Sequence, residues 1–273
     1  MSAQGPLLLV GGGKMGGAML AGWLARGMKP ADVAVVEPDA ERASSFKGAA
    51  GLIVAVRAED VPASFKPAVV VLAVKPQSMD AVASLYRRHV GPGCVFLSIA
   101  AGKTLGYFAR QLGAEAAVVR SMPNTPAAVG RGITVACANA RVSAAQRAAC
   151  DELLKAVGEV AWVDEEPLLD AVTAVSGGGP AYVFLLAESL AAAGVASGLP
   201  AELAARLARV TVAGAGELLH RAAESPATLR QNVTSPQGTT ERALAVLMGL
   251  QGWQPLLDRA IAAATARSKE LSG

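Results

Sequence analysis

Histidine and cysteine are scarce in this sequence, which contains two histidines and three cysteines. His89 and His220 stand alone on polar or amphipathic segments, where a histidine is usually a solvated surface residue. We therefore expect neither a Ser-His-Asp hydrolase nor a histidine-rich metal site. Cys94, Cys137 and Cys150 lack the spacing of metal ligands and are expected to be small buried side chains, so no metal is predicted.

Clusters of positive charge and long uninterrupted apolar runs are also missing. The net charge of +3 is scattered along the chain, which argues against a nucleic-acid partner. The most apolar late stretch, residues 181–196, contains Glu188 and Ser189, so we predict a core helix rather than a membrane span. Residues 1–6 lack the basic and apolar segments of a signal peptide. We therefore expect a cytoplasmic protein with no membrane partner.

Aromatic residues make up only 4% of the chain, so alanine, valine and leucine must fill its interior. Hydrophobic residues reach 52% and charged residues 17%, a composition that excludes disorder. The 273 residues suffice for one large domain or two ordinary ones. Glycine and proline signals thin out after Val163, and long alanine-rich helical patterns follow. We predict an α/β domain over residues 1–163 and an all-helical domain over residues 164–273.

A glycine-rich motif follows the first predicted strand. Residues 7–10 form a short apolar run that is typical of a strand buried on both faces. The run leads into a G-x-G-x-x-G pattern, whose members include Gly11, Gly13, Lys14, Met15 and Gly16. Such glycines make a tight turn, admit a pyrophosphate against the backbone and pack a helix closely on the strand. With a helix predicted over residues 15–26, the motif indicates a doubly wound, Rossmann-type dinucleotide-binding domain.

An acidic residue ends the second predicted strand, residues 33–36. Glu37 lies about twenty positions after Gly16, where a carboxylate holds the ribose 2′-hydroxyl of a dinucleotide. Because Glu37 would repel a 2′-phosphate and Pro38 follows it instead of a basic residue, NADH is favoured. Arg42 lies about a helical turn further on and could turn toward a phosphate, so NADPH stays open.

Two further strands are predicted at residues 68–74 and 95–99. In a parallel sheet their C-terminal ends lie on the same edge as the glycine loop, where doubly wound folds bind ligands. The residues at these ends are Val74, Lys75 and Pro76 for the first strand and Ala101 for the second. Residues 120–126 contain two prolines that restrict the backbone, and we expect Asn124 among them to support a rigid connector.

Far from these strands, residues 232–240 form a predicted loop that enters a helix. The run Ser-Pro-x-Gly-Thr-Thr supplies a helix breaker and N-capping residues, and helix-forming residues follow it. A helix N-terminus offers free backbone N–H groups and a positive dipole end, which together seat a small carboxylate. Thr239 and Thr240 add hydroxyl groups that donate or accept hydrogen bonds.

Several runs resemble those of pyrroline-5-carboxylate reductases, in matching order over nearly the whole chain. They are residues 74–76, 98–102, 120–126, 170–184 and 232–240. The resemblance implies a Rossmann-type doubly wound domain followed by an all-helical dimerisation domain. It also implies reduction of 1-pyrroline-5-carboxylate to L-proline, the last step of proline biosynthesis, with NADH or NADPH as cofactor. A protonated cyclic imine is already electrophilic, so orienting the reactants suffices and no histidine is needed.

The same resemblance implies roles for single residues. Thr240 would hydrogen-bond the imine nitrogen, while backbone N–H groups near Gly238 and Thr239 would hold the carboxylate. Glu166 would lie near the substrate and Asn232 would reach the cofactor. The implied cofactor-binding set is Gly11, Gly13, Lys14, Met15, Gly16, Glu37, Pro38, Val74, Lys75, Pro76, Ala101 and Asn232.

Two positions depart from the family pattern. Gly178 stands where the family usually has serine, which removes a polar contact, and Gln237 stands where it usually has glycine. If position 237 requires a positive φ, glutamine there costs about 1 kcal/mol. Neither departure touches Thr240, the residue expected at the imine nitrogen.

Two other functions remain open. An imine reductase or a 3-hydroxyacid dehydrogenase has a related build, but those dehydrogenases typically use a lysine in the helical half. No lysine lies between Lys155 and Lys269, which counts against them. The alternative without catalysis is a nucleotide-sensing protein that has kept only the cofactor fold. Oxidation of NAD(P)H on addition of pyrroline-5-carboxylate separates this alternative from a reductase.

The predicted helical domain has few aromatic residues for a thick core. A domain of this size buries only a modest fraction of its surface alone. We therefore expect helices such as residues 200–221 to pack against a second copy, giving a homodimer or a higher homo-oligomer such as a decamer. The active site would then be completed across the interface. The alternative is a monomer whose helices cover its own nucleotide domain.

Overall fold

The computed structural model describes residues 5–272. The chain divides into two compact units. The sheet unit consists of residues 1–177 together with 264–273, and the helical unit consists of residues 178–263. The sheet unit extends beyond Val163, so the boundary expected between residues 163 and 164 lies inside this unit. A division of function at that boundary stays a prediction.

The described part of the sheet unit contains one eight-stranded sheet in the order β3-β2-β1-β4-β5-β6-β7-β8. Neighbouring strands run parallel except for the pair β6–β7, which is antiparallel. The strands are β1 Leu7–Val10, β2 Val33–Val36, β3 Ile53–Ala55, β4 Val69–Leu72, β5 Val95–Ser98, β6 Ala117–Met122, β7 Gly132–Ala138 and β8 Gly158–Trp162. The four predicted strands are therefore present, two of them with the predicted bounds.

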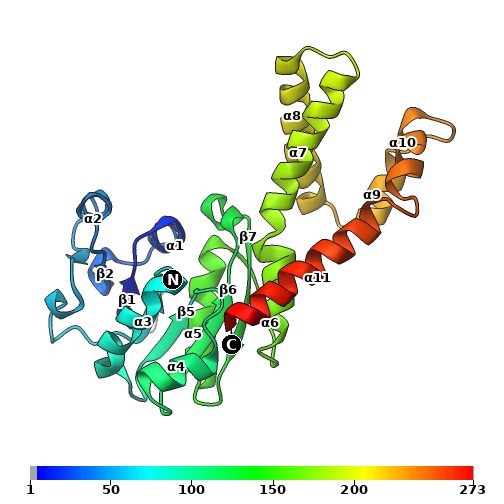
Figure 1. Cartoon of the computed structure of the whole chain (residues 1–273). Helices are drawn as coiled ribbons and strands as arrows, with labels where there is room; N and C mark the ends of the chain where they lie inside the picture. Colours follow the sequence, from blue (N-terminus) through cyan, green and yellow to red (C-terminus); the bar gives the residue numbers. More distant parts are fainter. Residues whose placement is uncertain (1–4, 273) are drawn as a thin grey trace. The chain divides into compact units, whose positions relative to one another are not determined.

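The central strands are buried on both faces, as their unbroken apolar runs require. Alternate residues enter different core clusters: Leu7, Leu9, Val33 and Val35 belong to one, and Leu8, Val10, Ala34 and Val36 to the other. Helices cover both faces of the sheet (Figure 1). Trp23 and Leu153 pack on the first face, and Phe108 packs on the second. This is the doubly wound α/β arrangement.

Two helices of the sheet unit, which start at residues 105 and 144, have clear side-chain caps. Thr104 accepts a hydrogen bond from the N–H of Tyr107, and Ser143 forms a capping box with Gln146. The α-helices of this unit are α1 Lys14–Ala25, α2 Ala40–Phe46, α3 Met79–Val82, α4 Leu105–Leu112, α5 Ala144–Leu154 and α6 Leu168–Val172. These caps fix where α4 and α5 start beside the strand ends.

The helical unit is built on a hairpin of α7 Gly179–Ala196 and α8 Ala201–Arg221, which pack side by side (Figure 1). Small residues allow the close approach, because a Cβ added at Gly194 would lie 3.2 Å from the Cβ of Ala204. The remaining helices are α9 Pro226–Asn232, α10 Thr239–Leu247 and α11 Trp253–Ser272. The last turns of α11, from Ala264 onward, belong to the sheet unit.

Helices α6 and α7 are separate elements joined by a π-helical segment, and α7 begins beside Pro180. Helix α6 ends at Val172, a π-helical segment spans Thr173–Gly177, and α7 begins at Gly179. Two hydroxyls hold the segment, because Thr173 donates to the Leu169 carbonyl at 2.7 Å and Ser176 to the Val172 carbonyl at 3.0 Å. Pro180 lies in the first turn of α7, where a missing N–H costs nothing. Gly178 is the N-cap of α7, so the glycine run lies where the π-helical segment passes into the next helix.

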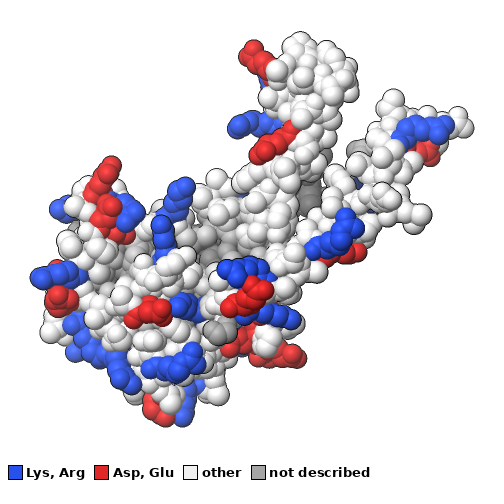
Figure 2. Space-filling view, viewed as in Figure 1, with Lys and Arg blue, Asp and Glu red and all other residues white. Residues whose placement is uncertain are grey.

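The prediction of a core helix at residues 181–196 is wrong for the single chain. No residue of α7 is buried. By length and composition the helical stretch Leu168–Ala196 could cross a membrane, and none of its most apolar window is buried. Helix α7 has one charged residue, Glu188, and the hairpin of α7 and α8 is mostly uncharged in the view of Figure 2, with acidic and basic side chains along one side. Exposed apolar faces of this extent mark an interaction surface.

Candidate functional site

The structure brings most of the predicted cofactor residues to one edge of the sheet. Gly11 follows β1, Glu37 follows β2, residues 74–76 follow β4, and Ala101 follows β5. These four strands are parallel, so their C-terminal ends share an edge. The chain order reverses between β1 and β4, the topological switch point where doubly wound folds bind ligands.

The glycine loop at this edge is an open cradle. Gly11 has φ +96°, and a Cβ there would lie 2.9 Å from the carbonyl oxygen of Ala73. A Cβ on Gly16 would overlap the Gly11 carbonyl oxygen, so the helix reaches its strand only through glycine. Gly13 caps α1 with no side-chain hydrogen bond, and the first turn of α1 has no acidic residue. The backbone N–H groups there fit the pyrophosphate of a dinucleotide.

Glu37 is fixed in place beside this loop. Its side chain is only 4% exposed and accepts hydrogen bonds from the Gly12 N–H at 2.8 Å and the Asp39 N–H at 2.9 Å. Arg42 donates to the same carboxylate at 3.2 Å and also lies 3.5 Å from the Asp39 carboxylate. The hydrogen bond from the Arg42 N–H lowers the pKa of Asp39, which caps α2. The carboxylate of Glu37 therefore joins the glycine loop to the start of α2.

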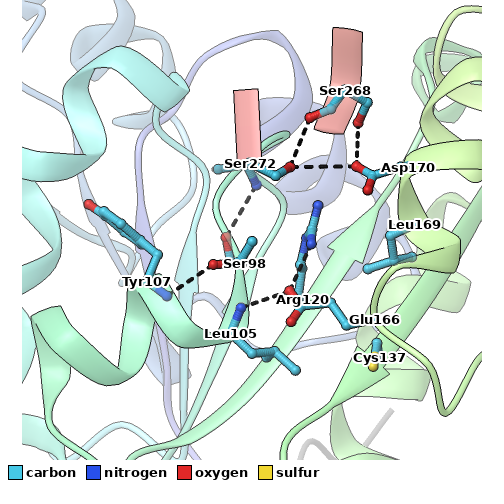
Figure 3. A network of polar contacts seen from close by, with 12 residues as sticks. Ser98, Leu105, Tyr107, Arg120, Cys137, Glu166, Leu169, Asp170, Ser268 and Ser272 are labelled. Atoms are coloured by element: carbon cyan, nitrogen blue, oxygen red, sulfur yellow. Dashed lines mark hydrogen bonds and ion pairs between the residues drawn. The ribbon is translucent and has the colours of Figure 1, made fainter. Parts of the chain in front are cut away.

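Glu166 anchors two elements of the sheet unit (Figure 3). Its carboxylate accepts from the Arg120 guanidinium at 2.7 Å and from the Leu105 N–H at 2.8 Å, at the start of α4. The Arg120 side chain is 5% exposed, so this is a largely desolvated ion pair. The structure thus shows a positioning role for Glu166, and its predicted nearness to substrate stays a prediction.

Asn124 supports its loop, as predicted. Its amide donates to the Ser176 carbonyl at 3.2 Å and accepts from the Ile133 N–H at 2.9 Å. The connector between β6 and β7 is thereby tied to the π-helical segment.

A second polar network joins the C-terminal turns of α11 to α6 (Figure 3), and the sequence patterns did not reveal it. Asp170 is 7% exposed and accepts from the Ser268 hydroxyl at 2.6 Å and the Ser272 hydroxyl at 3.5 Å. A Cβ on Gly102 would lie 3.1 Å from the Leu271 carbonyl oxygen, so these turns lie beside the loop that carries Ala101. The only available signal was serine in an otherwise alanine-rich helix.

The predicted substrate residues form an open helix N-terminus in the helical unit. Gly238 caps α10 with no side-chain hydrogen bond, and Thr239 and Thr240 are its first two residues, both exposed. A Cβ on Gly238 would lie 2.9 Å from the Ser235 carbonyl oxygen, which explains the glycine. Asn232 ends α9, in the same unit. The uncapped backbone N–H groups and the residue Thr240 thus lie in the same first turn of α10.

Gln237 has φ +58°, alone among the described non-glycine residues in having a positive φ. The conditional prediction for this position is therefore met, and the side chain is strained by about 1 kcal/mol. The Gln237 N–H donates to the Glu241 carboxylate at 2.7 Å, a bond that holds the turn against this strain.

Gln237→Gly is expected to stabilise the protein by about 1 kcal/mol, because glycine adopts a positive φ without a steric penalty. The measurement is the urea unfolding midpoint at one fixed protein concentration. Gln231→Gly is the matched control, since Gln231 is an exposed glutamine in α9 and glycine should destabilise that helix. Equal effects of the two substitutions would contradict the strain argument.

The cysteines are buried and free, as predicted. Burial raises the pKa of Cys94 and Cys150 to about 12, so these thiols stay protonated at neutral pH and offer no nucleophile. Among residues 5–272, no group of three or more His, Cys, Asp or Glu side chains is placed to hold a metal ion.

The fold and the glycine cradle define a dinucleotide-binding protein of the doubly wound α/β class with a helical C-terminal unit. Residues 166–271 match the family model described as pyrroline-5-carboxylate reductase dimerisation. Residues 7–102 match the model described as NADP oxidoreductase coenzyme F420-dependent.

Curated relatives match over almost their whole length. The chain is 40% identical over 267 residues to pyrroline-5-carboxylate reductase of Pseudomonas aeruginosa, covering 97% of this chain and 96% of the relative. It is 41% identical over 273 residues to the Synechocystis enzyme of that name, covering 99% of each. The solved Coxiella burnetii pyrroline-5-carboxylate reductase superposes with TM-score 0.91 at 34% identity, covering 98% of this chain and 99% of that one. The chain belongs to the pyrroline-5-carboxylate reductase family.

Proposed function

We propose that the protein reduces 1-pyrroline-5-carboxylate to L-proline with NADH or NADPH, the last step of proline biosynthesis. The observation that carries the proposal is the match to relatives of this name at 40% and 41% identity over nearly the whole chain. A Plasmodium falciparum pyrroline carboxylate reductase, solved with NADP bound, superposes with TM-score 0.80 at 28% identity, covering 98% of each chain. We place this activity in the cytoplasm.

The chain's own residues perform binding and orientation. The uncapped N-terminus of α1 holds the pyrophosphate, while residues 74–76 and Ala101 line the same edge of the sheet. A bound reduced nicotinamide supplies a hydride. The uncapped N-terminus of α10, at Gly238 and Thr239, holds the substrate carboxylate through backbone N–H groups and the helix dipole.

The Thr240 hydroxyl hydrogen-bonds the ring nitrogen, which carries its proton throughout the reduction. The imine carbon gains hydrogen with two electrons and the nitrogen keeps the proton, so no side chain has to deliver one. Such a reaction depends on orientation, because holding the two reactants in a reactive geometry strongly lowers the activation barrier. This accounts for catalysis by a hydroxyl in place of a histidine.

The helical unit supports a homo-oligomer with the active site completed across its interface. The family model that matches residues 166–271 describes dimerisation. The apolar faces of α7 and α8 are exposed in the single chain, including Phe184 at 62% and Val210 at 62%. A second copy that covers these faces buries the surface that a single chain leaves in water. We further propose that these dimers assemble into a larger homo-oligomer, such as a decamer.

The deciding experiment is to add 1-pyrroline-5-carboxylate to the purified protein with NADH or NADPH and to follow the loss of nicotinamide absorbance. Formation of proline in equal amount is the expected result. A protein that binds the nucleotide without oxidising it would instead be a nucleotide sensor. A 3-hydroxy acid incubated with the oxidised cofactors tests the dehydrogenase alternative, for which a larger rate would overturn the proposal.

A further inference from the structure

The two side chains that face the end of β2 are paired with each other, which bears on the choice of cofactor. Glu37 lies at the position that recognises the ribose 2′ group in doubly wound dinucleotide-binding folds. Its carboxylate accepts from the Gly12 N–H, the Asp39 N–H and the Arg42 guanidinium. The glycine loop and the start of α2 therefore determine where this negative charge lies.

The carboxylate of Glu37 still has room for one hydroxyl donor. An ionised carboxylate has about four acceptor sites. Its Oε1 accepts from Asp39 and Arg42, whereas its Oε2 accepts only from Gly12. A ribose 2′-hydroxyl can donate to the remaining site on Oε2 without displacing a bond within the protein. A 2′-phosphate has no hydrogen to donate there when fully ionised and meets a fixed negative charge.

Arg42, the residue that could attract a 2′-phosphate, is already committed. Its guanidinium lies 3.2 Å from the Glu37 carboxylate and 3.5 Å from the Asp39 carboxylate. Two negative groups thus share one positive group at this position. A phosphate would have to compete with both carboxylates for the arginine, while lying next to the charge of Glu37.

We propose that the Glu37–Arg42 pair selects the dinucleotide without a 2′-phosphate, so that this protein prefers NADH over NADPH. The inference rests on the proposed function only in taking a nicotinamide dinucleotide as the cofactor. Arg42 is a latent phosphate ligand that Glu37 holds neutralised. Removing the charge of Glu37 ends the repulsion and leaves the arginine paired with Asp39 alone, so a single substitution shifts the preference toward the 2′-phosphate.

The test is calorimetric binding of NAD⁺ and NADP⁺ to the full-length protein without any imine. The wild type is expected to bind NAD⁺ at least about tenfold more tightly than NADP⁺. Glu37→Gln keeps one carbonyl acceptor, enough for one of the two backbone N–H groups that Glu37 binds, and should tighten NADP⁺ binding about 10–100-fold. In Glu37→Gln combined with Arg42→Ala, most of that gain should disappear.

Glu41→Gln is the matched control, because Glu41 is an exposed acid in the same first turn of α2. It should leave the ratio of the two affinities within about twofold of the wild type. A wild type that binds NADP⁺ as tightly as NAD⁺ overturns the inference, and so does a gain that survives Arg42→Ala. Selective NAD⁺ binding without reduction of the imine would sustain this inference while refuting the proposed function.

Discussion

Thr240→Val is expected to lower turnover about 10–100-fold while leaving cofactor affinity nearly unchanged. Valine keeps the branched shape of threonine and removes the hydroxyl that we place at the ring nitrogen. Thr240 lies in the exposed first turn of α10, so its loss opens no cavity in a packed core. The cofactor cradle lies at the end of β1, which the substitution does not change.

Steady-state kinetics with 1-pyrroline-5-carboxylate give the turnover number, and calorimetry with NAD⁺ gives the cofactor affinity. Thr240→Ser is the matched variant, since it retains the hydroxyl and should retain most of the activity. A Thr240→Val protein with the kcat/KM of the wild type would remove Thr240 from the mechanism. Equal losses in the valine and serine variants would point to packing instead of hydrogen bonding.

The strands that hold the site could be predicted because each is a run of consecutive apolar residues, which indicates burial. Residues 7–10 and 33–36 are unbroken apolar runs, which at that length and with turn signals beside them are typical of a strand covered on both faces. The positive φ of Gln237 was predicted only conditionally, from the resemblance, which implies glycine at this turn position. In each case the information lies within a few residues of the feature.

The contacts that anchor the site could not be predicted in this way. Glu166 pairs with Arg120 across 46 positions, and Asp170 pairs with Ser268 across 98. Such pairs depend on how strands and helices are placed in space, which a local pattern does not contain. The π-helical segment at Thr173–Gly177 was missed for a different reason. Glycine and proline usually signal a break, but here backbone carbonyls are satisfied by nearby hydroxyls.

The apolar stripe on α8 leads to a second expected result of large size. Leu203, Leu207, Val210 and Leu218 recur at helical spacing and are 43%, 47%, 62% and 66% exposed. Ala204 and Ala208, on another face of the same helix, are buried. These four side chains therefore resemble the buried face of an amphipathic helix, but a single chain leaves them exposed to solvent.

Leu207→Glu is expected to shift the protein toward the 27.5 kDa mass of one chain and to lower activity about 100-fold or more. If a second copy covers the stripe, a carboxylate at position 207 would be buried without a partner, at a cost of several kcal/mol. Light scattering measures the mass, and the imine reduction assay measures the activity. Arg209→Glu is the control, because Arg209 is an exposed residue of α8 that lies off the stripe. An active wild type with the mass of one chain would end the proposal of an obligate oligomer.

Hybrid dimers then decide whether the active site is shared between copies. Gly13→Glu places a carboxylate in the phosphate cradle, and a Cβ at Gly13 meets no atom within 4 Å, so the loop can still fold. Neither this variant nor Thr240→Val should be fully active alone. If each site combines the cradle of one chain with α10 of its partner, co-folding both variants yields hybrids with one intact site. Equal mixing should restore about a quarter of the wild-type activity, because half of the dimers are hybrids. Activity no higher than the average of the two separate variants would place each complete site within a single chain.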